Sequence, residues 1–348
     1  MFTPDYQNIV NAALNRKSQR IPLYEHIINE GFIENFIGRR LGELRQGNAS
    51  DMQEYFRHYT GFFKDLGYDT VSFEGWTGSA MPESGALGTP KDGVIKTRED
   101  FNNYPWDEVP DIFFNMYAKY YEALRDQMPQ GMAGIGGIGN GVFECVQEVV
   151  GFEPLCLIKG DDEELYADLF TKVGDMLCAI WERFLPQYGD IFCVCRFGDD
   201  LGFRSATLLS PNDIREHIIP QYKRIIDIIH SYNKPFLLHS CGNIDAIMED
   251  LISVAGINAK HSNEDAIAPF SYWIDTYGAR IGNFGGLDTD VLCDVNDYDL
   301  VEYTTNVYNQ CANKGHGVAI GSGNSIPEYV CEKRFVKALE VIRGLRGE

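Results

Sequence analysis

The chain has 348 residues and a mass of 39.3 kDa, and 44% of the residues are hydrophobic, which excludes a disordered chain. Thirty Lys and Arg against 51 Asp and Glu give a formal net charge of −21. Because so acidic a chain repels phosphate backbones and anionic lipid surfaces, we expect neither nucleic acid nor a membrane among its partners. The oligomeric state stays open, with a homo-oligomer as one alternative.

The N-terminus and the cysteines predict the cellular compartment. Residues 1–6 hold no basic segment followed by an apolar one, and no stretch approaches about 18 apolar residues in a row, so neither secretion nor a membrane span is expected. The nine cysteines are an odd number, and Cys193, Cys195 and Cys241 lie in strand-like segments. We therefore expect free thiols and a cytoplasmic protein.

Eight short apolar runs, each ending in a polar or glycine-rich tip, alternate with helical periodicity along the chain. They cover residues 20–26, 70–75, 131–137, 191–197, 236–241, 257–261, 281–285 and 317–322. This count predicts an α/β fold, a single (β/α)8 (TIM-type) barrel domain over residues 1–348, with helical insertions in the N-terminal half at 26–70 and 75–131. A doubly wound open sheet would show a similar local pattern.

Three helices are predicted between the later runs. Residues 163–183 repeat apolar side chains on one face, which is typical of an amphipathic helix. Ser210 followed by Pro211 indicates the start of another helix, whose buried stripe is rich in isoleucine. A short crossover helix is expected over 243–254, which leaves room for right-handed connections between parallel strands.

The end of the 236–241 run carries the sharpest chemical signal, His239, Ser240 and Cys241. Residues i and i+2 of a strand point to the same side, so the imidazole and the thiol would face one point, as two ligands of a tetrahedral zinc ion require. The next run offers His261 and Glu264 as further ligands. The alternative is a buried strand end with an inert thiol, and His261 could instead orient a ligand or contact a substrate.

Other strand tips carry candidate acid–base groups. Asp199 and Asp200 follow an apolar run, and such a pair near a pocket binds a cationic group or raises one pKa; the alternative is that one caps the following loop while the other forms an ion pair. Glu25, His26 and Glu74 stand at the ends of the first two runs and are further candidates for general acids. Hydrogen bonding around the mouth of the barrel is the alternative for these groups.

Two tips are rich in glycine. The segment 134–140 matches a dinucleotide-binding fingerprint only imperfectly, and close packing explains its glycines as well. The segment 320–325 could bind an anion through backbone N–H groups or form a turn that needs positive φ.

Five passages at these tips together resemble the uroporphyrinogen decarboxylase superfamily, from about residue 20 to the C-terminus. The passages are 197–202, 238–243, 260–265, 283–288 and 321–327. The resemblance implies a (β/α)8 barrel with its pocket at the carboxyl ends of the strands. The superfamily includes porphyrin decarboxylases and zinc methyltransferases that serve corrinoid proteins, so membership alone does not define the reaction.

The decarboxylase branch fits this sequence poorly. Its members carry an arginine-rich segment after the first strand and an aspartate at the end of the second, and these groups hold the porphyrin carboxylates. Here the corresponding segments, 26–31 and 72–76, contain no arginine and no aspartate. We therefore do not expect porphyrin decarboxylation.

The methyltransferase branch is the closer resemblance. Its zinc is held by a His-x-Cys pair on the fifth strand, which matches His239 and Cys241, and the similar cobalamin-independent methionine synthases add a glutamate that corresponds to Glu264. Both groups also use a cysteine on the last strand, where this sequence has Ser322 or Gly323. A site with one thiolate is harder, so it suits activation of oxygen or nitrogen better than alkylation of a thiol.

The resemblance thus implies a Zn²⁺ enzyme that moves a methyl group from a small donor, for example an aryl methyl ether, to a corrinoid on a separate protein. Asp199, Asp200, Glu25 or His26 would protonate the leaving oxygen. The expected substrate contacts are Tyr24, Trp76, Phe203, Arg204, Phe284 and Asn324. The alternatives are a metal-free decarboxylase of a small non-porphyrin acid and a non-catalytic binding module for the donor or the corrinoid protein.

Overall fold

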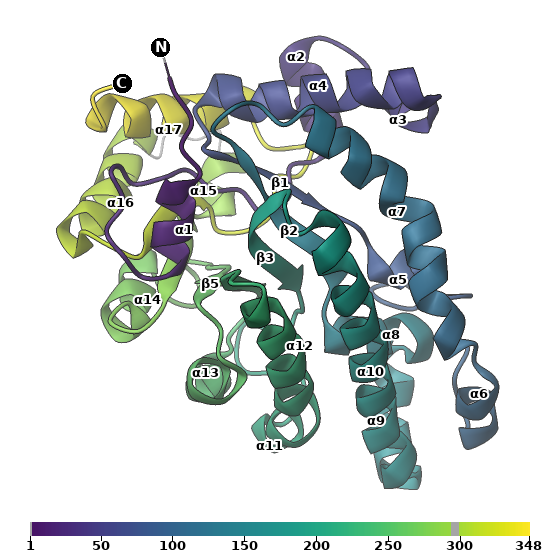
Figure 1. Cartoon of the computed structure of the whole chain (residues 1–348). Coiled ribbons are helices and arrows are strands. Elements are labelled where there is room, and N and C mark those ends of the chain that lie inside the picture. The colour runs from purple at the N-terminus through teal and green to yellow at the C-terminus, as the bar shows by residue number, and fades with distance from the viewer. Residues whose placement is uncertain (1, 294–298) are drawn as a thin grey trace.

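The computed structural model describes residues 2–293 and 299–348. Seven parallel strands form one sheet in sequence order, and helices pack around this sheet (Figure 1). They are β1 (Thr70–Glu74), β2 (Ala133–Asn140), β3 (Phe192–Gly198), β4 (Phe236–His239), β5 (Ala259–His261), β6 (Gly282–Leu287) and β7 (Val318–Ser322). Their carboxyl ends meet at one edge of the sheet, and the α/β fold is consistent with a TIM-type barrel.

The first predicted strand, over residues 20–26, does not form a strand, so the described sheet has seven strands in place of the expected eight. It forms one parallel bridge, Leu23 with Ile320 of β7. Tyr24 N–H donates to the Ile320 carbonyl at 2.9 Å, and Ile320 N–H donates to the Pro22 carbonyl at 2.9 Å. Because Pro22 has no N–H of its own, the hydrogen-bond ladder cannot extend toward the N-terminus.

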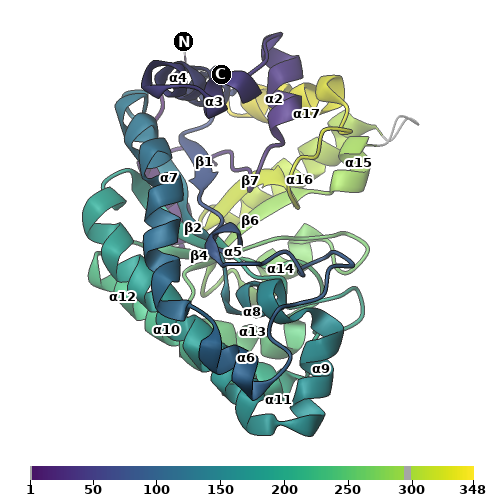
Figure 2. The same cartoon turned by 90° about the vertical axis from the view of Figure 1, so that its right-hand side faces the viewer.

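Helices lie along the flanks and at the amino end of the sheet. They are α1 (Gln7–Ala13), α2 (Glu30–Ile37), α3 (Gly42–Gln46), α4 (Ala49–Leu66), α5 (Thr77–Ala80), α6 (Arg98–Asn103), α7 (Val109–Asp126), α8 (Val142–Val150), α9 (Phe152–Asp161), α10 (Glu163–Tyr188), α11 (Pro211–Asp213), α12 (Ile219–Ser231), α13 (Met248–Asp250), α14 (Phe270–Tyr277), α15 (Thr289–Cys293), α16 (Leu300–Lys314) and α17 (Glu332–Leu345). Figure 2 shows α7, α10 and α12 side by side along one flank. No helix among the described residues is long and apolar enough to cross a membrane.

The three predicted helices are present. Helix α10 buries the expected apolar face, including Leu165, Leu169 and Val173. The Ser210 side chain accepts a hydrogen bond from the N–H of Asp213 at 3.1 Å, and α11 runs through a π-helical turn into α12. The predicted crossover over 243–254 is a chain of short turns centred on α13.

Two apolar clusters fill the fold, and they leave one end of the sheet to polar groups. The larger lies between the strands and the outer helices, and the smaller lies inside the sheet, where α1 packs with residues such as Ile135, Val194 and Leu237. Helix α1 covers the amino ends of the strands, since Tyr6 N–H donates to the Gly131 carbonyl at 2.9 Å just before β2. The carboxyl ends are therefore the end available for a site.

The glycines of β2 serve close packing against β1. Gly136 and Gly139 have φ angles of 147° and 94°, in the region that favours glycine. A Cβ atom on Gly136 would lie 1.8 Å from the Phe73 carbonyl oxygen, and one on Gly139 would lie 2.1 Å from that of Gly75. These glycines therefore let the two strands approach, which supports the close-packing interpretation of this segment.

Candidate functional site

The end of β4 brings His239 and Cys241 together, as the i, i+2 spacing predicts. Nε2 of His239 lies 3.4 Å from Sγ of Cys241. The imidazole is buried, whereas Cys241 is half-buried. Burial and the neighbouring Asp200 raise the pKa of the Cys241 thiol, so the sulfur carries its proton unless a cation binds it.

Hydrogen bonds behind this pair fix the tautomer of His239. Nε2 of His261 lies 2.9 Å from the Ser322 carbonyl oxygen, and the Nδ1 atoms of His261 and His239 are 2.7 Å apart. Burial lowers the pKa of His261 to about 3 and that of His239 well below its usual range, so both rings are neutral. A carbonyl only accepts, so His261 Nε2–H donates to it and His239 Nδ1–H donates to His261 Nδ1. The lone pair of His239 Nε2 is then free and faces Cys241.

Asp200 completes a group of three possible metal ligands at the ends of β3 and β4. Its Oδ1 accepts the N–H of Cys241 at 2.8 Å and lies 3.8 Å from Nε2 of His239. Ligand atoms of Asp200, His239 and Cys241 all lie within 4.8 Å of one another. The Asp200 side chain is 45% exposed, so it can turn toward a bound ion.

A second group of three possible ligands consists of His26, His239 and His261, all buried. The rings of His26 and His239 are stacked, with centroids 3.6 Å apart and planes within 4° of parallel. Burial lowers the pKa of His26 well below its usual range. Its Nδ1 is buried and has no hydrogen-bond partner among the residues that the structure describes. His26 therefore lies between the β4 end and a space beside it, and it contacts both.

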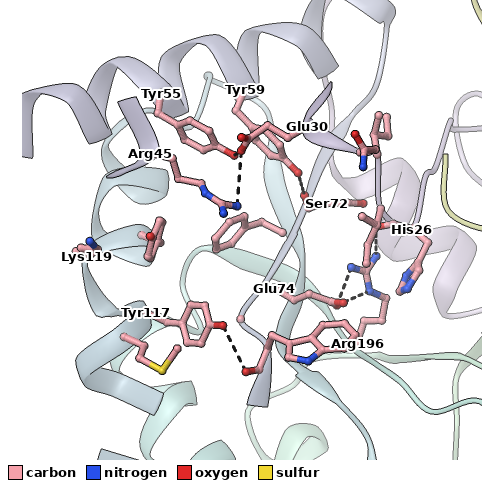
Figure 3. A pocket seen from close by; sticks show the side chains of 18 of the residues that line it. His26, Glu30, Arg45, Tyr55, Tyr59, Ser72, Glu74, Tyr117, Lys119 and Arg196 are labelled. Carbon is pink, nitrogen blue, oxygen red and sulfur yellow. Dashed lines mark hydrogen bonds and ion pairs between the residues drawn. The ribbon is translucent and has the colours of Figure 1, made fainter. Parts of the chain in front are cut away.

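That space is a pocket of 860 Å³ (Figure 3). Its aromatic walls come from β1, α4, α7 and the loop after β1, and its charged groups come from α2, α3, α7 and the sheet. The lining includes His26, Glu30, Arg45, Tyr55, Tyr59, Phe73, Glu74, Trp76, Tyr117, Lys119, Tyr120 and Arg196. Aromatic walls with three cations and two carboxylates suit a small, flat, polar molecule.

A buried ion pair forms the floor of this pocket. Nη2 and Nε of Arg196 lie 2.7 and 3.0 Å from the same oxygen of Glu74. Nη1 of Arg196 donates to the Tyr24 hydroxyl and to the His26 carbonyl, each at 2.9 Å. Arg196 has no exposed surface. The guanidinium thus holds the backbone of His26 in place, and Glu74 neutralises its charge.

Two predicted acid–base groups are engaged in structural hydrogen bonds. Asp199 accepts from the N–H groups of Phe143 and Glu144 at 2.9 and 2.7 Å and from the Tyr222 hydroxyl at 2.6 Å, so it anchors the start of α8. Burial raises the pKa of Asp199 against these donors. Asp199 therefore caps the start of α8, as one of the two interpretations of the sequence predicted, whereas Asp200 faces His239.

Glu25 is the second engaged group, and it ties the first segment of the chain to β7. Its carboxylate accepts from the N–H of Ser322 at 3.1 Å, from the Ser322 hydroxyl, and from the Tyr68 hydroxyl at 3.1 Å. Burial raises the pKa of Glu25 to about 7.

The predicted substrate contacts fall in four different environments. Trp76 lines the 860 Å³ pocket. Arg204 and Asn324 line a second pocket of 440 Å³, where Glu264 also lies, outside both groups of possible ligands. Phe203 is 63% exposed and is absent from the linings of both pockets.

Tyr24 and Phe284 require a correction, because they are buried inside the sheet and pack edge to face with centroids 5.1 Å apart. Both are core residues and not pocket walls. An inward-facing aromatic residue on a strand cannot be told from a pocket wall by its spacing alone.

Most of the residues that line the pocket are not predicted from the sequence. Arg196 lies within an apolar strand, and a cation there is itself a signal, because arginine is almost never fully buried without a partner. Its partner Glu74 is 122 positions away in the sequence, so no local pattern links the two. Arg45, Tyr55 and Tyr117 come from three different helices, and each alone is indistinguishable from an ordinary helical residue.

Comparisons with known proteins agree with this architecture. A methyltransferase from Methanosarcina mazei superposes with a TM-score of 0.72 at 15% identity, covering 100% of each chain. A proposed vitamin-B12 independent methionine synthase from Listeria monocytogenes gives a TM-score of 0.52 at 12% identity, covering 95% of this chain and 99% of the other. No curated protein matches the sequence. The family model for uroporphyrinogen decarboxylase (URO-D) matches residues 83–336, and the chain belongs to this family.

Proposed function

We propose that this protein is a zinc-dependent methyltransferase that moves a methyl group from a small donor, with an aryl methyl ether as the first candidate, to a corrinoid on a separate protein. The observation that carries the proposal is the 3.4 Å distance between His239 Nε2 and Cys241 Sγ. Zn–N bonds of about 2.0 to 2.1 Å and a Zn–S bond of about 2.3 Å at a tetrahedral angle separate N and S by about 3.5 Å. The donor pair therefore fits zinc.

The residues around the pair would prepare it for such a role. His261 directs the free lone pair of His239 Nε2 toward Cys241, through the two hydrogen bonds described above. When bound, Zn²⁺ supplies a Lewis acid that lowers the cost of negative charge on the leaving group, and the corrinoid supplies the nucleophile. The protein's own part is to bind the donor, orient it and exclude water.

The 860 Å³ pocket would hold the donor beside His26. Trp76, Tyr117 and Tyr59 offer faces and edges for an aromatic ring, and the pocket ends at the His26 ring that is stacked on His239. Of the predicted acid–base groups, Asp199 and Glu74 are held by strong donors. We propose that His26, whose Nδ1 has no partner among the described residues, hydrogen-bonds the leaving group.

The names of the two structural neighbours support methyl transfer, because one is a methyltransferase and the other is described as a methionine synthase. A second function is favoured by a different observation. Arg45 and the exposed Lys119 place cationic groups in the pocket, and such groups bind carboxylates. A metal-free decarboxylase of a small non-porphyrin acid is therefore the alternative.

The decisive experiment combines metal analysis with turnover. Protein purified without added metal or chelator is compared with His239→Ala and Cys241→Ser by elemental analysis. We expect about one zinc per chain in the wild type and its loss in both variants. Methyl donors are then screened with chemically reduced cobalamin as the acceptor, and methylcobalamin is followed by its absorbance. The proposal fails if Cys241→Ser retains both zinc and methyl transfer, and CO₂ release from carboxylates without metal would favour the decarboxylase.

A further inference from the structure

We infer that the metal site of this chain consists of Asp200, His239 and Cys241, with Asp200 in the place of the thiolate that the last strand lacks. The inference deepens the proposed function, on which it rests for zinc as the metal. It differs from the sequence interpretation, which takes Glu264 or His261 as the remaining ligand. The site offers one oxygen, one nitrogen and one sulfur donor and leaves a fourth position for the donor molecule.

The last strand cannot supply the missing ligand, because its polar groups have other partners. The single proton of the Ser322 hydroxyl is shared between the Glu25 carboxylate and the Asn324 carbonyl, while the Ser322 carbonyl accepts from His261. Nδ2 of Asn324 approaches Cys241 Sγ at 3.3 Å, but an amide N–H is a hydrogen-bond donor to sulfur and not a metal ligand. Glu264 lies in neither group of possible ligands.

The register of two neighbouring strands explains why Asp200 is available. Gly198 of β3 pairs with His239 of β4, so the residues two positions later, Asp200 and Cys241, end up side by side. The Cys241 N–H holds Oδ1 of Asp200 at 2.8 Å, and this oxygen lies 3.8 Å from His239 Nε2. Tetrahedral zinc would require about 3.4 Å between these two atoms, so a shift of about 0.4 Å by the half-exposed side chain brings this pair to the required distance.

The group of three histidines is the competing arrangement, and its geometry is unfavourable. If a metal ion were bound through Nδ1 of His239 and Nδ1 of His261, the 2.7 Å hydrogen bond between these two atoms would break. His261 would then no longer accept the Nδ1–H of His239. The lone pair of an imidazole lies in the ring plane. Because His26 and His239 are within 4° of parallel, their lone pairs cannot converge on one ion in this arrangement.

Charge also favours the set with Asp200. One carboxylate and one thiolate neutralise a divalent ion, as two thiolates do, and His239 stays neutral. Replacing a thiolate by a carboxylate makes the site harder, so it prefers a donor molecule whose leaving group is oxygen or nitrogen.

The test measures metal binding and its spectrum, and it does not require methyl transfer. Zinc affinity is determined by competition with a chromophoric chelator for the wild type, Asp200→Asn and the matched control Glu264→Gln. The amide oxygen of asparagine keeps the contact with the Cys241 N–H but loses the charge. We expect Asp200→Asn to raise the zinc Kd by about 100-fold and Glu264→Gln to change it by less than about threefold. Circular dichroism verifies that each variant is folded.

Cobalt(II) in place of zinc reports the ligands directly. The wild type is expected to show a sulfur-to-cobalt charge-transfer band from Cys241, and Asp200→Cys is expected to about double its intensity per bound cobalt. No gain in Asp200→Cys would overturn the inference, as would a zinc affinity of Asp200→Asn equal to that of the wild type. If Cys241→Ser still loses the metal in that case, the proposed function stands while this inference fails. A wild type that binds no zinc at all contradicts both.

Discussion

The ends of β3–β5 and the pocket beside β1 lie at the same edge of the sheet, but their side chains come from different kinds of segment. At the ends of β3–β5, the possible metal ligands come from short segments at adjacent strand ends. Each of these residues lies within two positions of a residue that is paired with the neighbouring strand. At the pocket, the lining comes from α2, α3, α4, α7, β1 and β3, and the central ion pair joins residues 122 positions apart. His26 is the side chain that both regions share.

This difference separates what the sequence can predict from what only the fold can assemble. The i, i+2 spacing sets side-chain direction in an extended segment, and the pairing continues past the end of β4 through Ser240 N–H to the His261 carbonyl, so His239 and Cys241 face one point. A pocket depends on how helices pack, and small differences in packing decide which side chains reach it. We therefore expect changes in the pocket to act on stability and substrate binding, and changes at β3–β5 to act on metal binding.

The largest expected effect is on stability, from the ion pair in the pocket floor. Arg196→Met removes the guanidinium and leaves the Glu74 carboxylate without its partner, where its side chain is 8% exposed. Removing one partner of a buried pair costs about 3 to 5 kcal/mol of unfolding free energy. Urea denaturation followed by circular dichroism measures it.

The double variant Arg196→Met with Glu74→Leu is the matched control. It removes both charges, so it is expected to recover most of the loss. Zinc content stays unchanged in every variant that is still folded, because Arg196 touches His26 but none of the proposed ligands. A double variant no more stable than Arg196→Met would show that the loss comes from packing or from the Tyr24 contact.

The second effect is a pH dependence of stability that comes from Glu25. Its pKa is about 7 in the folded protein and 4.5 as the ordinary value, so the folded state binds the proton more tightly. This contribution is fully present at low pH and is lost as the pH rises through 7. Between pH 5 and 8 the free energy of unfolding of the wild type should fall by about 2.5 kcal/mol more than that of Glu25→Gln, as measured by urea denaturation. Equal pH profiles for the two proteins would contradict the raised pKa.

The third effect concerns the orientation of His239. His261→Ala removes the acceptor of the His239 Nδ1–H, so zinc affinity is expected to fall by about 10- to 100-fold, whereas the cobalt spectrum of the metal that still binds keeps its sulfur band. His261→Asn places an amide oxygen near the former Nδ1 and should recover most of the affinity. If His261 were itself a ligand, both variants would lose affinity and the cobalt spectrum would change.

The strands and the helices were largely predictable, because each has a local cause. Seven of the eight apolar runs are strands, and α10 and the Ser210 cap follow from periodicity and capping. The first run failed as a strand for a reason that is also local, the missing N–H of Pro22, but the sequence alone does not show which N–H groups face β7.

The candidate site was predictable only in part. The spacing of His239 and Cys241 was sufficient to bring them together, whereas the proposal of Asp200 in place of Glu264 or His261 rests on strand register and ring tautomers. Strand register and ring tautomers depend on contacts between neighbouring strands, so they cannot be predicted from the residue pattern of one apolar run. Asp199 and Asp200 show this clearly, because the first caps α8 and the second faces His239 although they are neighbours in the sequence.

The smallest expected effect distinguishes Trp76 from Phe203, two aromatic residues that are both predicted from the sequence to contact the substrate. Trp76 lines the pocket and is 38% exposed, whereas Phe203 is 63% exposed and lies outside both pocket linings. With the methyl donor found in the screen, Trp76→Ala should lower kcat/KM by about 10-fold, since it removes an aromatic contact with the substrate. Phe203→Ala should change it by less than about twofold, and neither variant should change zinc content. A loss with Phe203→Ala alone would place the substrate in the second pocket, beside Arg204, and not in the β1 pocket.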